Sequence, residues 1–137
     1  MTSSCRRLRT SSYARRKEAW SSGAKVGVAI SPRGARPVPS SPVSAGAQGI
    51  VVAGVGDGNF TTPALEALKR ARAKGVNVVR ASRVGSGIVR RNIEVNDDQL
   101  GSVASMALNP AKSRVLLKLA LTKTKDPAAI QAYFDGG

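Results

Sequence analysis

The segment Gly49–Asn59 constrains the fold of this chain more than any other stretch. Four consecutive apolar residues, Ile50 to Ala53, are typical of a short buried strand. Glycines then stand at alternate positions, and glycine permits a tight turn or a close approach of the backbone to a ligand. Thr61-Thr62-Pro63 follows, and a Thr before Pro favours a helix start, because the hydroxyl can cap free N–H groups and Pro fits the first helical position. This pattern predicts a strand, a glycine turn and a helix, with the turn at the carboxyl end of the strand, where open α/β sheets bind ligands.

The residues after this turn predict a β-α-β unit. Residues 63–74 place small and apolar residues on one helix face and basic residues largely on the other. Gly75 is expected to end the helix in the left-handed conformation, and residues 76–82 form the next strand. Two strands joined by one helix should be parallel, with a right-handed crossover. The predicted fold class is therefore α/β with a small parallel, Rossmann-like sheet.

The rest of the chain alternates polar loops with helix signals. Residues 83–101 are mixed and are interpreted as a loop that displays solvated acids, namely Glu94, Asp97 and Asp98. Residues 103–108 fit either a strand or a short helix. Asn109-Pro110 and Asp126-Pro127 predict two further helices, ending near residues 122 and 134. The expected apolar residues of the first are Val115, Leu116, Leu119 and Ala120; those of the second are Ala129, Ile130 and Phe134.

The amino-terminal third of the chain has a different composition. Residues 1–44 are rich in Ser, Arg and Pro and show no steady apolar period, so they are predicted to be a basic, disordered leader in front of a domain at residues 45–137. The chain carries a net charge of +14. Residues 1–48 hold nine Lys or Arg and one Glu, and thus more than half of that excess. A nucleic-acid arm is the functional alternative for the leader.

Composition also excludes several kinds of site. The chain has one cysteine, Cys5, and no histidine, which excludes an internal disulfide, a Cys-based zinc framework and any Ser–His or Cys–His nucleophile pair. No apolar run is long enough for a membrane span. The chain shows no export signal, so a cytoplasmic location is the default expectation. No metal and no cofactor are predicted.

Two motifs that suggest other chemistry do not fit. Gly54 to Asn59 resembles a dinucleotide-binding fingerprint, but Asn59 replaces its last glycine, and the acid expected near the end of the second strand is absent. Asp97 and Asp98 could form a carboxylate pair for metal binding or acid–base work. Adjacent residues in an extended loop point apart, however, which favours two solvated surface charges.

Taken together, the motifs resemble the C-terminal domain of bacterial type II L-asparaginases. The resemblance rests on blocks in the same order and spacing: Gly-Ile-Val-Val-Ala-Gly-x-Gly-x-Gly-Asn from Gly49, Val-Val-Arg-x-Ser-Arg from Val78, Glu-Val-x-Asp-Asp from Glu94, Leu-Asn-Pro-x-Lys-x-Arg-Val-Leu-Leu from Leu108 and Leu-Thr-x-Thr-Lys-Asp-Pro from Leu121. It covers residues 45–134, and residues 1–44 match nothing in that family.

The resemblance implies an activity that needs no metal or cofactor. Enzymes of this family hydrolyse L-asparagine to L-aspartate and ammonia, using a Thr nucleophile of an N-terminal domain. They are typically exported to the periplasm and form tetramers, in which the C-terminal domain completes the site of a neighbouring subunit.

Two residues carry over by their motif positions. Asn59 matches the Asn that reaches the substrate pocket of the neighbouring subunit, and Glu94 matches the Glu that holds the α-ammonium group of the substrate. A carboxylate binds a cation through charge-assisted hydrogen bonds, and an amide supplies both a donor and an acceptor. Asn59 also favours asparagine over glutamine, because relatives with strong glutaminase activity often have Ser there.

The departures from the family pattern limit the expected activity. The Gly-Gly-Thr-Ile and His-Gly-Thr-Asp motifs, which hold the catalytic residues, are absent. The strand and helix that normally precede Gly49 are also expected to be missing, which would leave strand 50–53 with an unpaired edge. The resulting prediction is an incomplete asparaginase C-terminal domain with Asn59 and Glu94 as substrate-binding residues, no catalytic residue and no hydrolysis by the chain alone. The alternative is a basic α/β module that binds nucleic acid.

Overall fold

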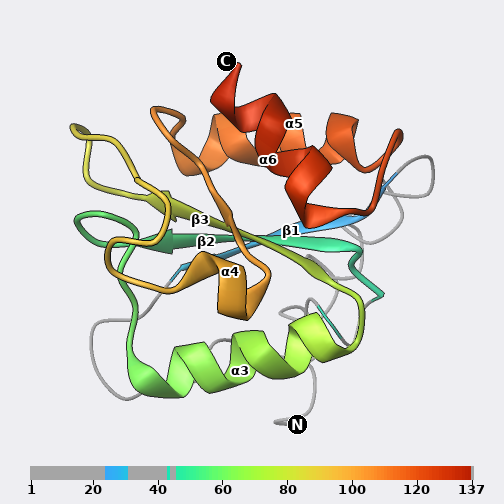
Figure 1. Cartoon of the computed structure of the whole chain (residues 1–137), viewed down its shortest axis with the longest axis horizontal. Coiled ribbons are helices and arrows are strands. Elements are labelled where there is room, and N and C mark those ends of the chain that lie inside the picture. The colour runs from blue at the N-terminus through green and yellow to red at the C-terminus, as the bar shows by residue number, and fades with distance from the viewer. Residues whose placement is uncertain (1–23, 31–42, 44–45, 137) are drawn as a thin grey trace, which may run out of the picture.

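The sheet has four parallel strands in the order β1-β2-β3-β4 (Figure 1). A computed structural model describes residues 24–30, 43 and 46–136 of the chain. The strands are β1 (Val26–Ile30), β2 (Gly49–Gly54), β3 (Asn77–Ser82) and the short β4 (Val103–Ala104). Every residue of β2 and β3 is buried, as expected for central strands covered on both faces.

Helices cover both faces of the sheet and make it the middle of three layers. Helix α3 (Thr62–Ala73) lies on one face, and α5 (Pro110–Ala120) and α6 (Pro127–Asp135) lie on the other (Figure 1). The short α4 (Asp97–Leu100) directly precedes β4. Two apolar clusters fill the spaces between the layers. One contains Ile50, Val52, Val78, Ala64 and Leu68, and the other contains Val51, Val79, Leu117, Ile130 and Phe134.

The predicted β-α-β unit is confirmed. Strands β2 and β3 pair in parallel register, with Ile50 opposite Val78. Helix α3 connects them, and Gly75 just after it has a φ of +80°, the left-handed conformation that a helix-ending glycine adopts. Residues 103–108 contain a strand rather than a helix, since β4 pairs with β3.

The prediction of an unpaired edge on strand 50–53 is wrong. Strand β1 pairs in parallel along that edge, with Val26 opposite Gly49 and Ile30 opposite Ala53. The alternation in Val26–Ile30 is short and lies beside a Pro- and Ser-rich stretch, which is why the sequence pattern missed it. These residues fall inside the predicted leader. Most of residues 1–44 lies outside the described residues, and the division of the chain at residue 45 stays a prediction.

Two local expectations about the helices are also wrong. Thr61 is the N-cap residue of α3, but its hydroxyl makes no capping hydrogen bond; Pro63 and the extended backbone at Thr61 define the helix start instead. On α5 the predicted apolar face is wrong for two of its four residues, since Val115 and Leu119 are exposed. Ala120 is buried and Leu116 packs against the core as predicted, and Leu117 is buried beside them. The capping of α5 was predicted correctly, since Asn109 Oδ1 accepts a hydrogen bond from the Lys112 N–H at 2.9 Å.

Candidate functional site

The turn after β2 is built around glycine. The backbone groups of Val55 and Asn59 bond to each other in both directions, at 3.1 and 2.8 Å, and close a tight loop at the carboxyl end of the strand. A Cβ atom on Gly54 would lie 2.5 Å from the Asn59 carbonyl oxygen, which is too close for any other residue. Gly58 has a φ of +78°. These glycines allow the chain to reverse and project Asn59 from the edge of the sheet.

The two predicted site residues lie in direct contact. Asn59 Nδ2 donates a hydrogen bond to Glu94 Oε2 at 3.2 Å, although the residues are 35 positions apart. Both residues are exposed, and Asn59 Oδ1 also accepts a bond from the Phe60 N–H at 2.7 Å. The Asn59 amide keeps one N–H and one acceptor lone pair for another partner. An exposed carboxylate beside an amide can hold an ammonium group and a polar neighbour.

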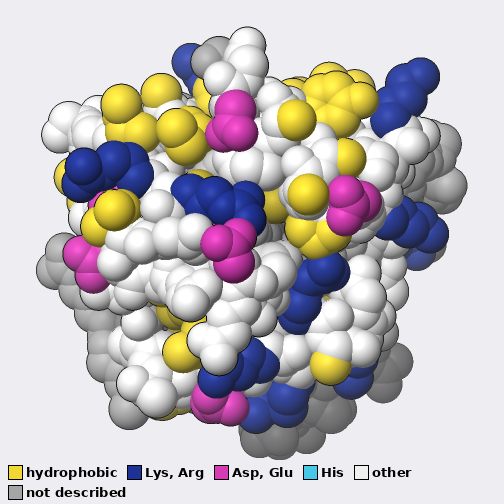
Figure 2. Space-filling model, in the orientation of Figure 1, with side chains coloured by type: hydrophobic (Ala, Val, Ile, Leu, Met, Phe, Trp, Pro, Cys, Tyr) yellow, Lys and Arg dark blue, Asp and Glu magenta, His cyan; other side chains and the backbone are white. Residues whose placement is uncertain are grey.

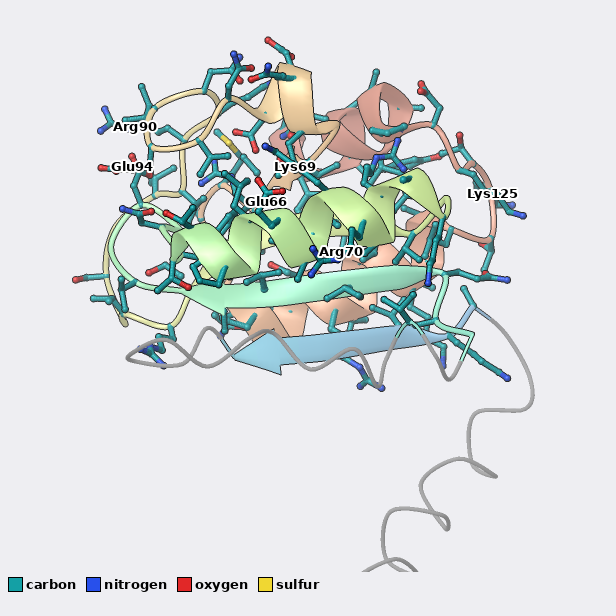
Figure 3. All side chains as sticks on the ribbon, turned by 90° about the horizontal axis from the view of Figure 1, so that it is seen from below. Glu66, Lys69, Arg70, Arg90, Glu94 and Lys125 are labelled. Carbon is teal, nitrogen blue, oxygen red and sulfur yellow. The ribbon has the colours of Figure 1, made fainter. Side chains whose placement is uncertain are left out.

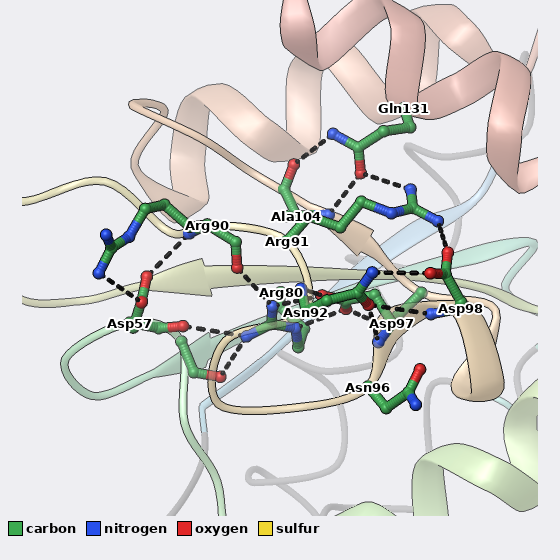
Figure 4. A network of polar contacts seen from close by, with 12 residues as sticks. Asp57, Arg80, Arg90, Arg91, Asn92, Asn96, Asp97, Asp98, Ala104 and Gln131 are labelled. Atoms are coloured by element: carbon green, nitrogen blue, oxygen red, sulfur yellow. Dashed lines mark hydrogen bonds and ion pairs between the residues drawn. The ribbon is translucent and has the colours of Figure 1, made fainter.

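A fully buried arginine on β3 lies beneath this contact. The Arg80 Nε and Nη2 atoms donate to the two Asp97 carboxylate oxygens at 2.7 and 2.6 Å. Nη2 also donates to the Arg90 carbonyl at 3.0 Å, and Nη1 donates to the carbonyls of Asp57 and Gly58 at 2.9 and 3.4 Å. A guanidinium has five N–H donors, and each has an acceptor here (Figure 4).

Asp97 is equally buried, and the expectation of a solvated charge there is wrong. Besides Arg80, its carboxylate accepts bonds from the Ser102 hydroxyl and from the Asn92 N–H, the latter at 2.9 Å. Burial alone would raise the pKa of Asp97. The hydrogen bonds from Arg80, Ser102 and Asn92 together outweigh burial and lower that pKa below its usual range. Asp97 is therefore a buried, ionised partner of Arg80.

Further contacts tie the glycine turn to the loop that carries Glu94. The Asp57 carboxylate accepts the Arg90 N–H at 2.8 Å and pairs with the Arg90 guanidinium at 3.6 Å. Asn92 Oδ1 accepts the Asp97 N–H at 2.8 Å, in return for the bond that Asn92 donates. We refer to Asp57, Arg80, Arg90, Asn92 and Asp97 as the Arg80 network (Figure 4).

Asp98 lies next to this network but outside the core. It is exposed and pairs with Arg91, and Asn92 Nδ2 donates to it at 2.7 Å. Both bonds lower the pKa of Asp98. Asp97 and Asp98 do point apart, as predicted, but the cause is helix α4, which directs Asp97 into the core and Asp98 toward solvent. They do not form a carboxylate pair, and the described residues contain no cluster of three or more Cys, His, Asp or Glu side chains suited to a metal ion.

Sequence reasoning missed the role of Arg80. A signal was present, because a charged residue stands inside the apolar run Val78-Val79-Arg80-Ala81 of a strand predicted to be buried. Buried arginines are nearly always paired, so an acid elsewhere in the chain was required. Which of the nearby acids served as the partner could not be read from the sequence.

Basic side chains form no continuous patch on the face shown in Figure 2. Lys and Arg are interleaved there with Asp, Glu and apolar side chains. In the described part of the chain, no helix is long and apolar enough to cross a membrane. The predicted nucleic-acid alternative gains no support from this distribution, since a binding surface needs clustered cations.

Comparison with known proteins gives consistent matches. The Glutaminase/Asparaginase C-terminal domain family matches residues 28–134, so the expectation that residues 1–44 match nothing in that family is wrong for residues 28–44. The probable periplasmic L-asparaginase of Haemophilus influenzae is 55% identical over 93 residues, which cover 68% of this chain and 27% of that protein. L-asparaginase 2 of Escherichia coli is 47% identical over 112 residues, 81% of this chain and 32% of that protein. The glutaminase-asparaginase of Acinetobacter glutaminasificans is 45% identical over 93 residues, 66% of this chain and 28% of that protein. The chain thus spans about a third or less of the length of these relatives.

Proposed function

Because the chain belongs to the Glutaminase/Asparaginase C-terminal domain family, we propose that it supplies substrate-binding residues to the active site of an L-asparaginase. Glu94 binds the α-ammonium group of L-asparagine, and Asn59 completes the hydrogen bonding around it. The observation that carries this proposal is the 3.2 Å contact between Asn59 Nδ2 and Glu94 Oε2 at the carboxyl edge of the sheet. An exposed carboxylate held by a neutral amide keeps its charge available for a cation.

The reaction itself requires residues beyond this chain. The matched segments cover only 27% and 32% of the two most similar relatives named above, and the Thr nucleophile expected from the family resemblance has no counterpart motif here. We therefore expect the chain to hydrolyse asparagine only when the remaining part of an asparaginase is supplied, in the homo-oligomer that the resemblance implies. Asn59 favours asparagine over glutamine. The periplasmic relative suggests the same compartment for a complete protein.

Complementation tests this proposal. The full chain would be co-expressed with the part of Escherichia coli L-asparaginase 2 that it does not match, and ammonia release from L-asparagine measured on the purified complex. We expect activity from the mixture and none from either part alone. A purified, folded complex without activity, or activity of the chain alone, would contradict the proposal.

Substitutions then test the two residues. Glu94→Gln removes the charge that binds the ammonium group, a loss of about 1.5–3 kcal/mol, and should raise KM by about 10–100-fold. Asn59→Ala should have a smaller effect in the same direction. Glu66→Gln is the matched control, because Glu66 lies on the surface of α3 and, among the described residues, forms its ion pair with Lys69 alone (Figure 3). Equal KM values for Glu94→Gln and Glu66→Gln would show that Glu94 does not bind substrate.

A further inference from the structure

We propose that the buried pair Arg80–Asp97 positions Asn59 and Glu94, by fixing the distance between the glycine turn and the loop that carries Glu94. That role presupposes the substrate-binding function proposed above for Asn59 and Glu94. Arg80 and Asp97 have no exposed side-chain surface, so they are positioning residues that act through their neighbours and not groups that touch substrate.

The contacts of Arg80 reach both sides of the site. Its Nη1 atom holds the carbonyls of Asp57 and Gly58, the two residues directly before Asn59. Its Nη2 atom holds the carbonyl of Arg90, at the start of the segment that carries Glu94. A single rigid, planar group therefore joins segments that no strand pairing joins, because the turn and the loop lie beyond the ends of β2 and β3.

Asp97 fixes the other end of the Glu94 segment. It accepts the Asn92 N–H, and Asn92 Oδ1 accepts the Asp97 N–H, so the short loop between these residues is closed at its base. Glu94 lies inside this closed loop, two residues after Asn92 and three before Asp97. Asn59 and Glu94 are thus each held within a few residues of the same ion pair, while their own side chains stay exposed.

The geometry also explains why arginine is required at this strand position. Lysine would keep the positive charge, but a single ammonium cannot bond both Asp97 oxygens and three carbonyls that lie in different directions. Arg80→Lys should therefore loosen the turn against the loop. Misplacement of a binding group by a fraction of the length of a hydrogen bond weakens substrate binding and orientation, even where no substrate contact is deleted.

Nuclear magnetic resonance on the full chain tests the positioning without any activity. In the wild type we expect a nuclear Overhauser effect between the Asn59 side-chain amide protons and the Glu94 γ protons. Folded Arg80→Lys should lose it, and Glu66→Gln should keep it. An unchanged signal in folded Arg80→Lys would overturn the proposal. If Arg80→Lys does not fold, Asp97→Asn, which removes the negative charge of the buried pair and keeps the side-chain shape, should weaken the signal; an unchanged signal in folded Asp97→Asn would then overturn the proposal.

Kinetics of the complemented complex test whether Arg80 acts through Glu94. Arg80→Lys should raise KM by about tenfold. In the double variant Arg80→Lys/Glu94→Gln the increase should be little more than in Glu94→Gln alone, because the residue being positioned is gone. If the KM increases of the two single variants multiply in the double variant, Arg80 does not act through Glu94, and the proposal is overturned. If complementation itself fails while the resonance result holds, the proposed function is wrong and the positioning of the two side chains stands.

Discussion

The Arg80 network and the outer face of α3 are both rich in charge, yet their charges do different things. In the network, Arg80 and Asp97 are fully buried and every guanidinium N–H has an acceptor. On α3, Glu66 and Lys69 form a 3.0 Å pair with about half of each side chain exposed. Burial decides the outcome, since water screens the surface pair and cannot reach the other. A charge pair can hold a site in place only where neither water nor another side chain can take the place of a lost partner.

The largest expected effect is on stability when one partner of the buried pair is removed. Asp97→Ala leaves a buried guanidinium without its counter-charge and should lower the free energy of unfolding by about 3–5 kcal/mol. Urea unfolding monitored by circular dichroism measures this change. Asp98→Ala is the matched control, because the adjacent Asp98 pairs with Arg91 at the surface, where water screens the charges, and its removal should cost much less stability. Equal losses for the two variants would show that burial does not separate these pairs.

Protonation of Asp97 should also lower the free energy of unfolding, by less than the substitution Asp97→Ala does. Its pKa is lowered in the folded chain, so the folded state binds this proton more weakly than the unfolded state. The ion pair therefore contributes fully above the unfolded pKa of about 3.9, and this contribution is lost as the pH falls through the lower folded value. Urea unfolding at a series of pH values should show the stability difference between the wild type and Asp97→Asn shrinking below about pH 4. A difference that stays constant to about pH 2 would contradict an ionised Asp97.

Two glycines with similar φ angles allow the packing of the Arg80 network to be compared with the packing at the end of α3. Gly58 beside the network has a φ of +78°, and Gly75 at the end of α3 has a φ of +80°. Alanine at either position should cost about 1 kcal/mol for the left-handed backbone. At Gly58 the new Cβ would also lie 2.9 Å from Val89 Cγ1 and 3.1 Å from Arg80 Nη1, whereas at Gly75 it meets nothing within 4 Å. Overpacking in Gly58→Ala should therefore lower the free energy of unfolding by about 1–3 kcal/mol more. Urea unfolding measures this difference. Similar losses at both sites would mean that the turn over Arg80 is loosely packed.

Much of the fold could be predicted from local patterns. The apolar run of β2, the amphipathic α3 and the Asn-Pro and Asp-Pro helix starts are short-range signals, and each was confirmed. The pairing of β2 with β3 was predicted, but its pairing with β1 on the other edge was not, because β1 precedes β2 across a stretch with no regular sequence pattern. The buried face of α5 was predicted only in part, since tertiary packing selects Leu117 rather than Val115 and Leu119 from a helix that has apolar residues on more than one side.

The candidate site was also predicted in part, but from the family resemblance and not from local patterns. Asn59 and Glu94 were identified by their positions in the family motifs, and the structure brings them together. The pairing of Arg80 with Asp97 depends on contacts between segments that are 17 residues apart, and adjacent acids look alike in a sequence. Only the helical turn at Asp97–Leu100 distinguishes them, by directing Asp97 inward and Asp98 outward. Long-range polar pairing is thus the part of the site that local patterns cannot supply.

The smallest expected effect lies on α3. Glu66→Gln breaks the surface pair with Lys69, which spans three positions on one helix face, and should lower the free energy of unfolding by about 0.5 kcal/mol or less. The same urea titration measures it, and Lys69→Gln should give a similar value. About 1 M salt should abolish the difference from the wild type, because it screens exposed charges, and the loss in Asp97→Ala should persist in that salt. A salt-resistant loss in Glu66→Gln would place this helix face in contact with another part of the chain and remove the contrast between the two regions.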